Sequence, residues 1–176
     1  MDNRTHWFAV KTFYNHLPTV RRAMEDKGWR TYVAMTVVQE VRKGRLSYRE
    51  KPLVGGLLFV RCTAEELRAF KFEHNSQMLY YADPETRQPS PIDEAEMRSF
   101  IIATAPDRET RVEYLGENVP DFRRGEHVRV TKGLYAGAEG WIRKIGSDRK
   151  LLVAVTGVAV VALSYIHPAY LEKIEE

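Results

Sequence analysis

Histidine and cysteine are the residues of this 176-residue chain whose types first suggest chemistry. A metal site needs several His, Cys or carboxylate ligands at short spacing. The five histidines are dispersed, and none has a second ligand at such a spacing; they are His6, His16, His74, His127 and His167. The only cysteine, Cys62, ends an apolar segment, which is typical of a small buried side chain rather than of a nucleophile. We therefore expect no metal site and no cofactor.

Two further patterns that resemble catalytic motifs have structural explanations. The glycine run from 133 to 140 lacks the Gly-Lys-Ser/Thr ending of a phosphate-binding P-loop and continues into a strand pattern instead of a helix. Carboxylates stand in the first turns of expected helices, where the helix dipole favours negative charge; they are Glu65, Glu66, Glu94 and Glu96. No nucleophile, base and orienting group come together, so the sequence predicts no catalytic residue and a protein that is not an enzyme.

The charge pattern suggests binding. The net charge of +3 hides a basic first third, in which residues 1–62 hold 12 Lys and Arg against 5 Asp and Glu. Residues 123–150 are basic as well, with 8 against 3, and the segment between them is acidic. Two cationic surfaces of this kind commonly meet phosphate backbones or acidic proteins. An equal alternative is that these charges are ordinary solvated surface charges that bind no partner.

The sequence also bears on location. A single cysteine fits a reducing compartment, and residues 1–20 contain no apolar run of the signal-peptide type. The segment 151–166 is uncharged, but its 16 residues are short for a membrane helix, which needs about 20. Its valines and the central Thr156-Gly157 favour two buried strands joined by a tight turn. We expect a cytoplasmic protein, monomeric and without membrane contact.

Periodicity predicts the elements that must position any binding residues. Strands are expected at 6–13, 31–41, 53–62 and 78–82, and helices at 15–27, from 63 and from 93. The first helix is expected to be capped by Asn15, and the second by a capping box of Thr63 and Glu66. This order predicts an α+β fold, an antiparallel sheet flanked by helices.

The second half of the chain differs in composition. Residues 105–124 are charged, contain prolines and show no sustained period, so they are expected to form a linker. From Gly125 onward, short strands alternate with glycine turns, which predicts a small five-stranded β-barrel. We expect domains at 1–104 and 125–176.

A cluster of cations surrounds one predicted turn. The segment VRKGRLSYREK, from Val41, carries Arg42, Lys43, Arg45, Arg49 and Lys51 around a Lys-Gly pair. Cations at a hairpin tip can grip phosphate, so we expect nucleic-acid binding here. Arg68 and Lys71, on the outer side of the second helix, are weaker candidates. A hairpin kept soluble by its charge is the alternative.

Four motifs in order resemble one protein family. The stretch EHVRVTKGLYAGAEGWIRKI, from Glu126, resembles the KOW motif, whose glycines suit positive φ or close chain approach. HWFAVKTFYN, REKPLVGGLLFVR and the segment from Pro89 to Phe100 resemble successive parts of the NusG N-terminal domain. The order is that of the NusG/RfaH family of transcription elongation factors. LYYADPETRQPSPI and GVAVVALSYIHPAYLEKI are most similar to the UpxY group, which antiterminates capsular-polysaccharide operons.

The resemblance implies a binding mechanism. In the family, an apolar patch of the N-terminal domain docks on the clamp helices of the largest RNA polymerase subunit and suppresses pausing or termination. Here that patch maps to Val54, Leu57 and Phe59, with Phe8, Leu79 and Tyr81 near its margin. Because Leu57 and Phe59 alternate with Leu58 and Val60, one of these two sets must belong to the core. Val54-Gly55-Gly56-Leu57 also departs from the family's usual aromatic, Pro and Tyr.

The resemblance also implies further partners. The nucleic acid would be non-template DNA or nascent RNA, and the KOW domain would recruit a ribosomal protein, termination factor Rho or RNA. Tyr135 and Trp141 are its natural contact residues, although both could instead close the barrel. Two rival functions remain: an RNA-binding or ribosome-associated KOW protein that ignores polymerase, and an enzyme that uses the N-terminal domain.

Overall fold

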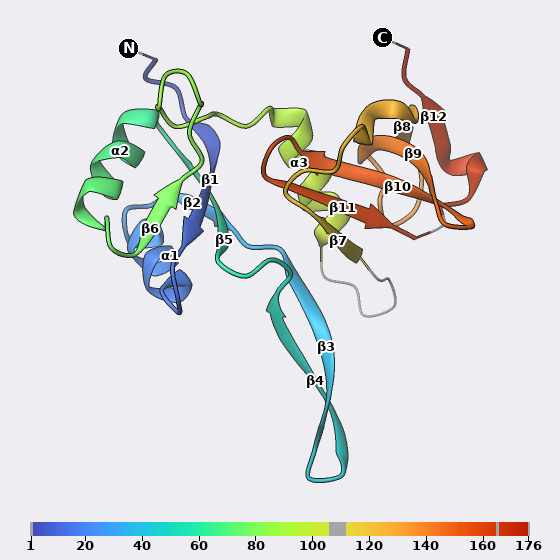
Figure 1. Cartoon of the computed structure of the whole chain (residues 1–176), viewed down its shortest axis with the longest axis horizontal. Coiled ribbons are helices and arrows are strands. Elements are labelled where there is room, and N and C mark those ends of the chain that lie inside the picture. Colours follow the sequence, from blue (N-terminus) through green and yellow to red (C-terminus); the bar gives the residue numbers. More distant parts are fainter. Residues whose placement is uncertain (1, 106–111, 165, 176) are drawn as a thin grey trace. The chain divides into compact units, whose positions relative to one another are not determined.

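The computed structural model describes residues 2–105, 112–164 and 166–175 (Figure 1). The chain forms two compact units, one of residues 1–34 and 54–94 and the other of residues 35–53 and 95–176. An α+β architecture results, as expected: the first unit combines a sheet with helices, and the C-terminal part is all β after one helix. None of the described helices is long and apolar enough to cross a membrane.

The first unit contains a four-stranded antiparallel sheet. Its strands are β1 (His6–Thr12), β2 (Arg30–Tyr32), β5 (Leu57–Cys62) and β6 (Met78–Tyr80), in the order β2-β5-β1-β6. The central pair, β1 and β5, is buried almost continuously. The expected strand at 31–41 is divided: Val33 and Ala34 break it into β2 and a later strand.

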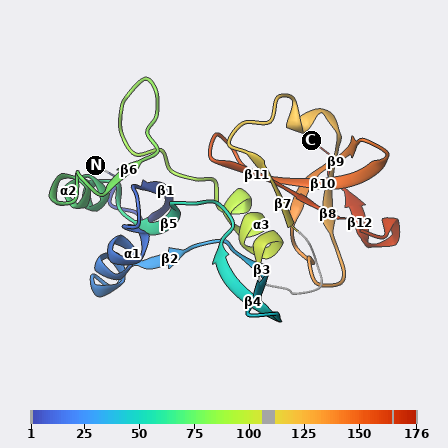
Figure 2. The same cartoon turned by 60° about the horizontal axis from the view of Figure 1, so that its bottom comes forward.

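Two helices cover one side of this sheet, α1 (Leu17–Asp26) and α2 (Ala64–Glu73) (Figure 1 and Figure 2). The predicted capping box of α2 is confirmed, since Thr63 Oγ1 accepts from Glu66 N at 3.1 Å and Thr63 N donates to Glu66 Oε2 at 2.8 Å. The predicted cap of α1 is wrong. His16 occupies the N-cap without a side-chain hydrogen bond, and a proline in the first turn supplies the helical φ instead.

The basic segment forms a long hairpin of β3 (Met35–Arg42) and β4 (Arg45–Pro52), which make a two-stranded sheet of their own (Figure 1). Lys43 and Gly44 form its turn with φ of 51° and 73°. Two consecutive positive φ values are the signature of a type I′ turn, whose twist matches that of paired strands. The predicted Lys-Gly turn is therefore confirmed.

The second unit contains a six-stranded antiparallel sheet with the order β12-β8-β9-β10-β11-β7. Its strands are β7 (Val112–Gly116), β8 (Glu126–Val130), β9 (Glu139–Ile145), β10 (Asp148–Val155), β11 (Ala159–Leu163) and β12 (Leu171–Lys173). Two short 3₁₀ helices, Phe122–Arg124 and Pro168–Tyr170, connect strands. The uncharged segment forms β10 and β11 around the Thr156-Gly157 turn, as predicted.

This sheet has one strand more than the five expected, because part of the expected linker is a strand. β7 pairs with β11, and Leu115, Val119 and Phe122 pack on a buried cluster formed by β10 and β11. The rest of the expected linker includes 106–111, which lie outside the described residues. A charged sequence without clear periodicity can still pair at a sheet edge, because its partner strand supplies the apolar surface.

The glycines of the KOW-like segment serve the roles expected of them. Gly133 and Gly137 have φ of 85° and 94°. At Gly140, a Cβ atom would lie 2.2 Å from the carbonyl oxygen of Leu152 on the neighbouring strand. Only glycine lets β9 and β10 approach this closely.

Helix α3 (Glu94–Thr104) is tied to the C-terminal sheet by hydrogen bonds. Thr156 N donates to Glu96 Oε2 at 3.1 Å, and Glu139 N donates to Ser99 Oγ at 2.9 Å. These contacts place most of α3 in the second compact unit. The division into domains at 104 and 125 follows the sequence pattern and stays a prediction.

Candidate docking face and basic hairpin

The sheet of the first unit has two chemically different faces. Residues paired directly across an antiparallel sheet point to the same face, and neighbours along a strand point to opposite faces. One face carries Phe8, Val10, Leu58 and Val60, all at most 1% exposed. The other carries the charged Lys11 and Arg61, which a helix-covered face would not tolerate unpaired. We call this second face the docking face.

Three rows of paired residues make up the docking face. Lys11 lies between Leu57 and Leu79, Phe59 lies between Ala9 and Tyr32, and Arg61 lies between Trp7 and Arg30. The register therefore brings together three of the expected docking residues, Leu57, Phe59 and Leu79. A band of apolar and aromatic side chains, bordered by cations, results.

Exposure differs sharply along this band. Leu79 is 47% exposed, whereas Leu57 and Phe59 are 4% and 0% exposed. Strand alternation predicted that one of the two sets, Leu57/Phe59 or Leu58/Val60, belongs to the core, and in the structure both sets are buried. Leu57 and Phe59 are therefore not accessible to a partner in this structure, whereas Leu79 is. Val54 lies in the bend before β5 and is half-buried.

Phe8 does not belong to this face. It pairs with Val60 and is 1% exposed, so it packs in the opposite, helix-covered face. Phe8 was expected at the margin of the docking face. The register places it instead on the opposite face of the sheet from Ala9 and Phe59, because neighbouring residues of a strand point to opposite faces.

The margin contains residues that sequence reasoning missed. The guanidinium of Arg30 lies 5.6 Å from the ring centroid of Trp7, within cation–π distance. Arg61 Nη1 donates to Glu94 Oε1 at 2.7 Å. Tyr32 packs on Phe59 with ring centroids 6.4 Å apart. No local pattern identifies Arg30 and Tyr32, since they reach this margin only when β2 pairs with β5.

Tyr81 anchors a loop beside the docking face. Its N–H donates to the carbonyl of Ala9 at 2.9 Å, and its carbonyl accepts from Ser90 N at 3.0 Å. Asp83 Oδ1 accepts from the N–H groups of Glu85 and Thr86, both at 2.9 Å, which keeps the pKa of this carboxyl below its usual value. The loop after Tyr81 is thus held by the Asp83 side chain, by backbone hydrogen bonds within the loop and by one to β1.

The β3–β4 hairpin separates charge from apolar surface. Arg42 pairs with Arg45, Val38 with Arg49 and Thr36 with Lys51, so all four cations share one face. The opposite face, which the sequence reading missed, presents Val41, Leu46 and Tyr48, which are 72%, 56% and 62% exposed. Lys43 stands in the turn.

Glu40 partly neutralises the cationic face of the hairpin. Its carboxylate lies 3.0 Å from Arg49 Nε and 3.6 Å from Arg42 Nε. The tip, with Arg42, Lys43 and Arg45, therefore keeps a surplus of positive charge. Directly opposed arginines repel each other, so an anionic ligand between them would relieve this repulsion.

The remaining predicted cations lie elsewhere. Arg68 and Lys71 belong to α2 of the first unit. Arg68 donates to the side-chain amide oxygen of Gln88, and Lys71 is half-buried.

Trp141, one of the two residues expected to contact a partner of the KOW domain, is packed within the second unit. Its ring stacks on His127 with centroids 4.4 Å apart and meets Phe122 edge-on at 5.4 Å. The Arg123 guanidinium lies 5.3 Å from the same ring. Tyr135 is half-buried in the turn before β9, and its carbonyl accepts from Ala138 N at 3.0 Å.

The described residues contain no group of three or more His, Cys, Asp or Glu side chains that could hold a metal ion. Cys62 is buried, and burial raises the pKa of its thiol to about 12, with a smaller effect from Glu66. A thiol of this kind is neutral at physiological pH and a poor nucleophile.

Comparison with known proteins identifies the family of this chain. The family model described as "Transcription termination factor nusG" matches residues 5–101, more than half of the chain. The chain belongs to the NusG family. It is a transcription termination/antitermination factor of that family and not an enzyme.

Two individual proteins resemble this NusG-family chain. The transcription termination/antitermination protein NusG of Borreliella burgdorferi is 22% identical over 160 residues, which cover 83% of this chain and 85% of that protein. A solved structure described as "Domain interaction in Thermotoga maritima NusG" is 21% identical, covers 98% of both chains and aligns with a TM-score of 0.45.

Proposed function

We propose that this NusG-family protein binds RNA polymerase through the docking face and suppresses pausing or termination during elongation. The observation that carries the proposal is the band of Leu57, Phe59 and Leu79 bordered by Lys11 and Arg61. An apolar centre with a charged rim is the usual composition of a protein-binding surface. The partner surface would be the clamp helices of the largest polymerase subunit.

The mechanism is binding without chemistry. A factor that contacts the clamp on one side of the DNA cleft and the opposite lobe on the other holds the clamp closed. Its binding free energy then favours the elongating state over paused states that need an open clamp. The β3–β4 hairpin would add contacts to non-template DNA or nascent RNA through Arg42, Lys43 and Arg45.

The C-terminal unit would recruit a second partner, a ribosomal protein, Rho or RNA. Tyr135 is the better contact candidate, because Trp141 is packed against His127 and Phe122. The similarity of residues 79–92 and 157–174 to the UpxY group supports a role as a dedicated antiterminator of capsular-polysaccharide operons.

Polymerase binding is tested with the full chain and bacterial core RNA polymerase. The best variant is Leu79→Asp, because Leu79 is already 47% exposed and its replacement leaves the core intact. We expect affinity to fall at least about tenfold, since a charge would be buried against an apolar partner. Leu57→Asp is less informative because a buried carboxylate at a position 4% exposed would also destabilise the sheet.

Phe72→Asp is the matched control, since Phe72 is another largely exposed apolar residue, on α2. It should bind polymerase like the unaltered protein. A competing clamp-helix peptide should displace the unaltered chain. Equal affinity of folded Leu79→Asp would refute the docking face, and RNA binding without any polymerase binding would favour the RNA-binding or ribosome-associated alternative.

A further inference from the structure

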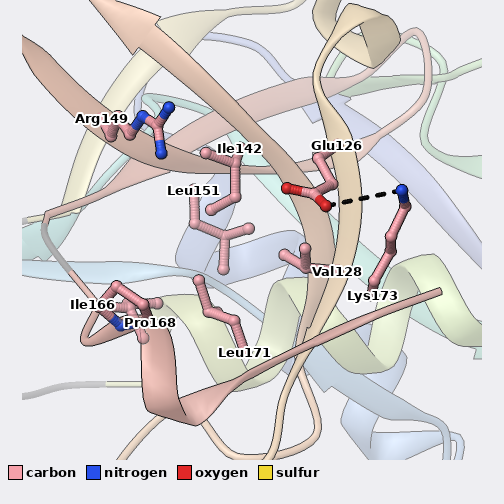
Figure 3. Close-up of a pocket in the computed structure, with 9 residues that line it drawn as sticks. All are labelled: Glu126, Val128, Ile142, Arg149, Leu151, Ile166, Pro168, Leu171 and Lys173. Carbon is pink, nitrogen blue, oxygen red and sulfur yellow. Dashed lines mark ion pairs between the residues drawn. The ribbon is translucent and has the colours of Figure 1, made fainter.

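A cavity of about 260 Å³ opens within the second unit, at one end of the C-terminal sheet (Figure 3). Its apolar lining consists of Val128, Ile142, Leu151, Ile166, Pro168 and Leu171. Three charged residues also line it, Glu126, Arg149 and Lys173. None of these nine residues takes part in the docking face or the hairpin.

Strand register explains why these residues meet. Ile142 pairs with Glu126 on one side and with Leu151 on the other, and Val128 pairs with Lys173. Paired residues share a face, so the four strands β8, β9, β10 and β12 direct their side chains into one space. The segment from Ile166 through Pro168 to Leu171 forms the remaining wall (Figure 3).

The charged residues make the lining of the cavity cationic. Glu126 and Lys173 face each other at 3.8 Å, a long and exposed ion pair. Arg149 pairs across the sheet with Lys144, so two cations stand directly opposite on the face that lines the cavity. Among the described residues, no ion pair is formed by Arg149 or by Lys144. Two opposed cations beside an apolar space favour a ligand that carries negative charge.

We propose that this cavity binds one apolar side chain of an acidic peptide segment from a partner protein. The apolar side chain would enter between Ile142, Ile166 and Leu171, which are partly exposed, with Val128 and Leu151 buried at the base of the cavity. A neighbouring carboxylate would pair with Arg149. This inference is independent of the proposed polymerase docking, because it uses residues of the second unit alone.

Size and position favour a peptide over a free small molecule. A volume of about 260 Å³ is below the range of about 300 to 1,000 Å³ of small-molecule sites, but it holds a leucine or phenylalanine side chain. β12, which contributes Leu171 and Lys173, is the end strand of the described sheet. An end strand is where an extended peptide can lie alongside.

The lining also argues against a nucleobase. Bases in single strands are held by stacking on aromatic side chains. All six apolar lining residues are aliphatic. The positive charge near the cavity therefore serves a carboxylate better than a stacked base.

The test uses the full isotope-labelled chain and a capped heptapeptide that contains one leucine among aspartates. Binding is followed by NMR as shifts of the backbone amides of Val128, Leu151 and Leu171. We expect saturable shifts there, and at least about tenfold weaker binding in Arg149→Glu, because attraction becomes repulsion. Arg149 is exposed, so this variant should keep the fold.

Matched controls distinguish binding in the cavity from attraction to the overall charge of the protein. Arg22→Glu, on the exposed side of α1, changes the net charge equally and should bind like the unaltered chain. A peptide with lysines in place of aspartates should bind Arg149→Glu better than the unaltered chain. A peptide with serine in place of leucine should bind weakly to both.

Three results would overturn the proposal. The first is no shift of these amides at millimolar peptide. The second is equal weakening in Arg149→Glu and Arg22→Glu, which would indicate bulk charge. The third is binding of octanoate as tightly as the leucine peptide, which would make the cavity a site for small amphipathic carboxylates.

Discussion

Neutralising the tip of the β3–β4 hairpin should weaken nucleic-acid binding by an amount that the structure allows us to calculate. The variant replaces Arg42, Lys43 and Arg45 with glutamine. These three cations lie in or next to the type I′ turn. Arg49 is left unchanged, because its Nε lies 3.0 Å from Glu40, closer than the 3.6 Å of Arg42 Nε. Glutamine is uncharged, polar and unbranched, so the hairpin should persist.

The expected magnitude follows from counterion release. Each phosphate contact contributes about 0.9 to the slope of log affinity against log salt for duplex DNA and about 0.7 for single strands. Loss of three contacts should reduce the slope by about 2.7 or about 2.1, respectively. The form of nucleic acid whose slope falls by its expected amount is the form that the hairpin binds.

The assay is fluorescence anisotropy of a labelled DNA duplex and a labelled single strand over a range of salt concentrations. A control variant, Arg22→Gln with Lys27→Gln and Arg98→Gln, removes the same charge from the exposed surface of α1, its C-terminal end and α3. The control should leave the slope nearly unchanged. An unchanged slope in the hairpin variant, or an equal fall in both variants, would refute the assignment of this hairpin to phosphate binding.

Two further predictions concern stability and reactivity. Gly140→Ala should destabilise the C-terminal sheet by about 2 to 4 kcal/mol, because the new Cβ at 2.2 Å from the Leu152 carbonyl forces β9 and β10 apart. Urea unfolding followed by NMR of that unit measures this, and Gly55→Ala, which meets no atom within 4 Å, should be nearly neutral. Cys62 should resist iodoacetamide in the native protein at pH 8, because burial raises its thiol pKa to about 12. Alkylation at pH 8 as fast as in urea would show that the thiol is not buried. The raised folded-state pKa also means that the free energy of unfolding should fall above about pH 9, the usual thiol pKa, because the unfolded state then ionises more readily than the folded state.

Local sequence signals determined several elements of this protein. The Thr63 and Glu66 capping box, the Lys43-Gly44 turn and the division of the uncharged segment into β10 and β11 each depend on residues close together in the chain. Such signals need no knowledge of the rest of the fold, because a cap or a tight turn satisfies its backbone groups locally. The weaker signal at Asn15 failed, because Pro18 suits a helix that begins one residue later.

The binding surfaces were only partly predictable. The cations of the hairpin could be found in the sequence because strand period places them on one face once the turn is known. The assignment of Leu57, Phe59 and Leu79 to a docking surface stays a prediction. The burial of both Leu57 and Phe59 could not be predicted, since alternation defines two faces and does not say what covers each one. Phe8 was assigned to the wrong face for the same reason.

The remaining contacts of the binding surfaces depended on the pairing of strands that are distant in the sequence. Tyr32 joins the docking face only because β2 pairs with β5, and β7 exists as a strand only because β11 offers it an edge. The cavity near Arg149 likewise collects residues from 126 to 173 through the register of four strands. The sequence by itself determined the family, the local turns and the charge of each segment. The identity of the residues that meet across strands depended on long-range hydrogen-bonded register, which no short stretch of sequence encodes.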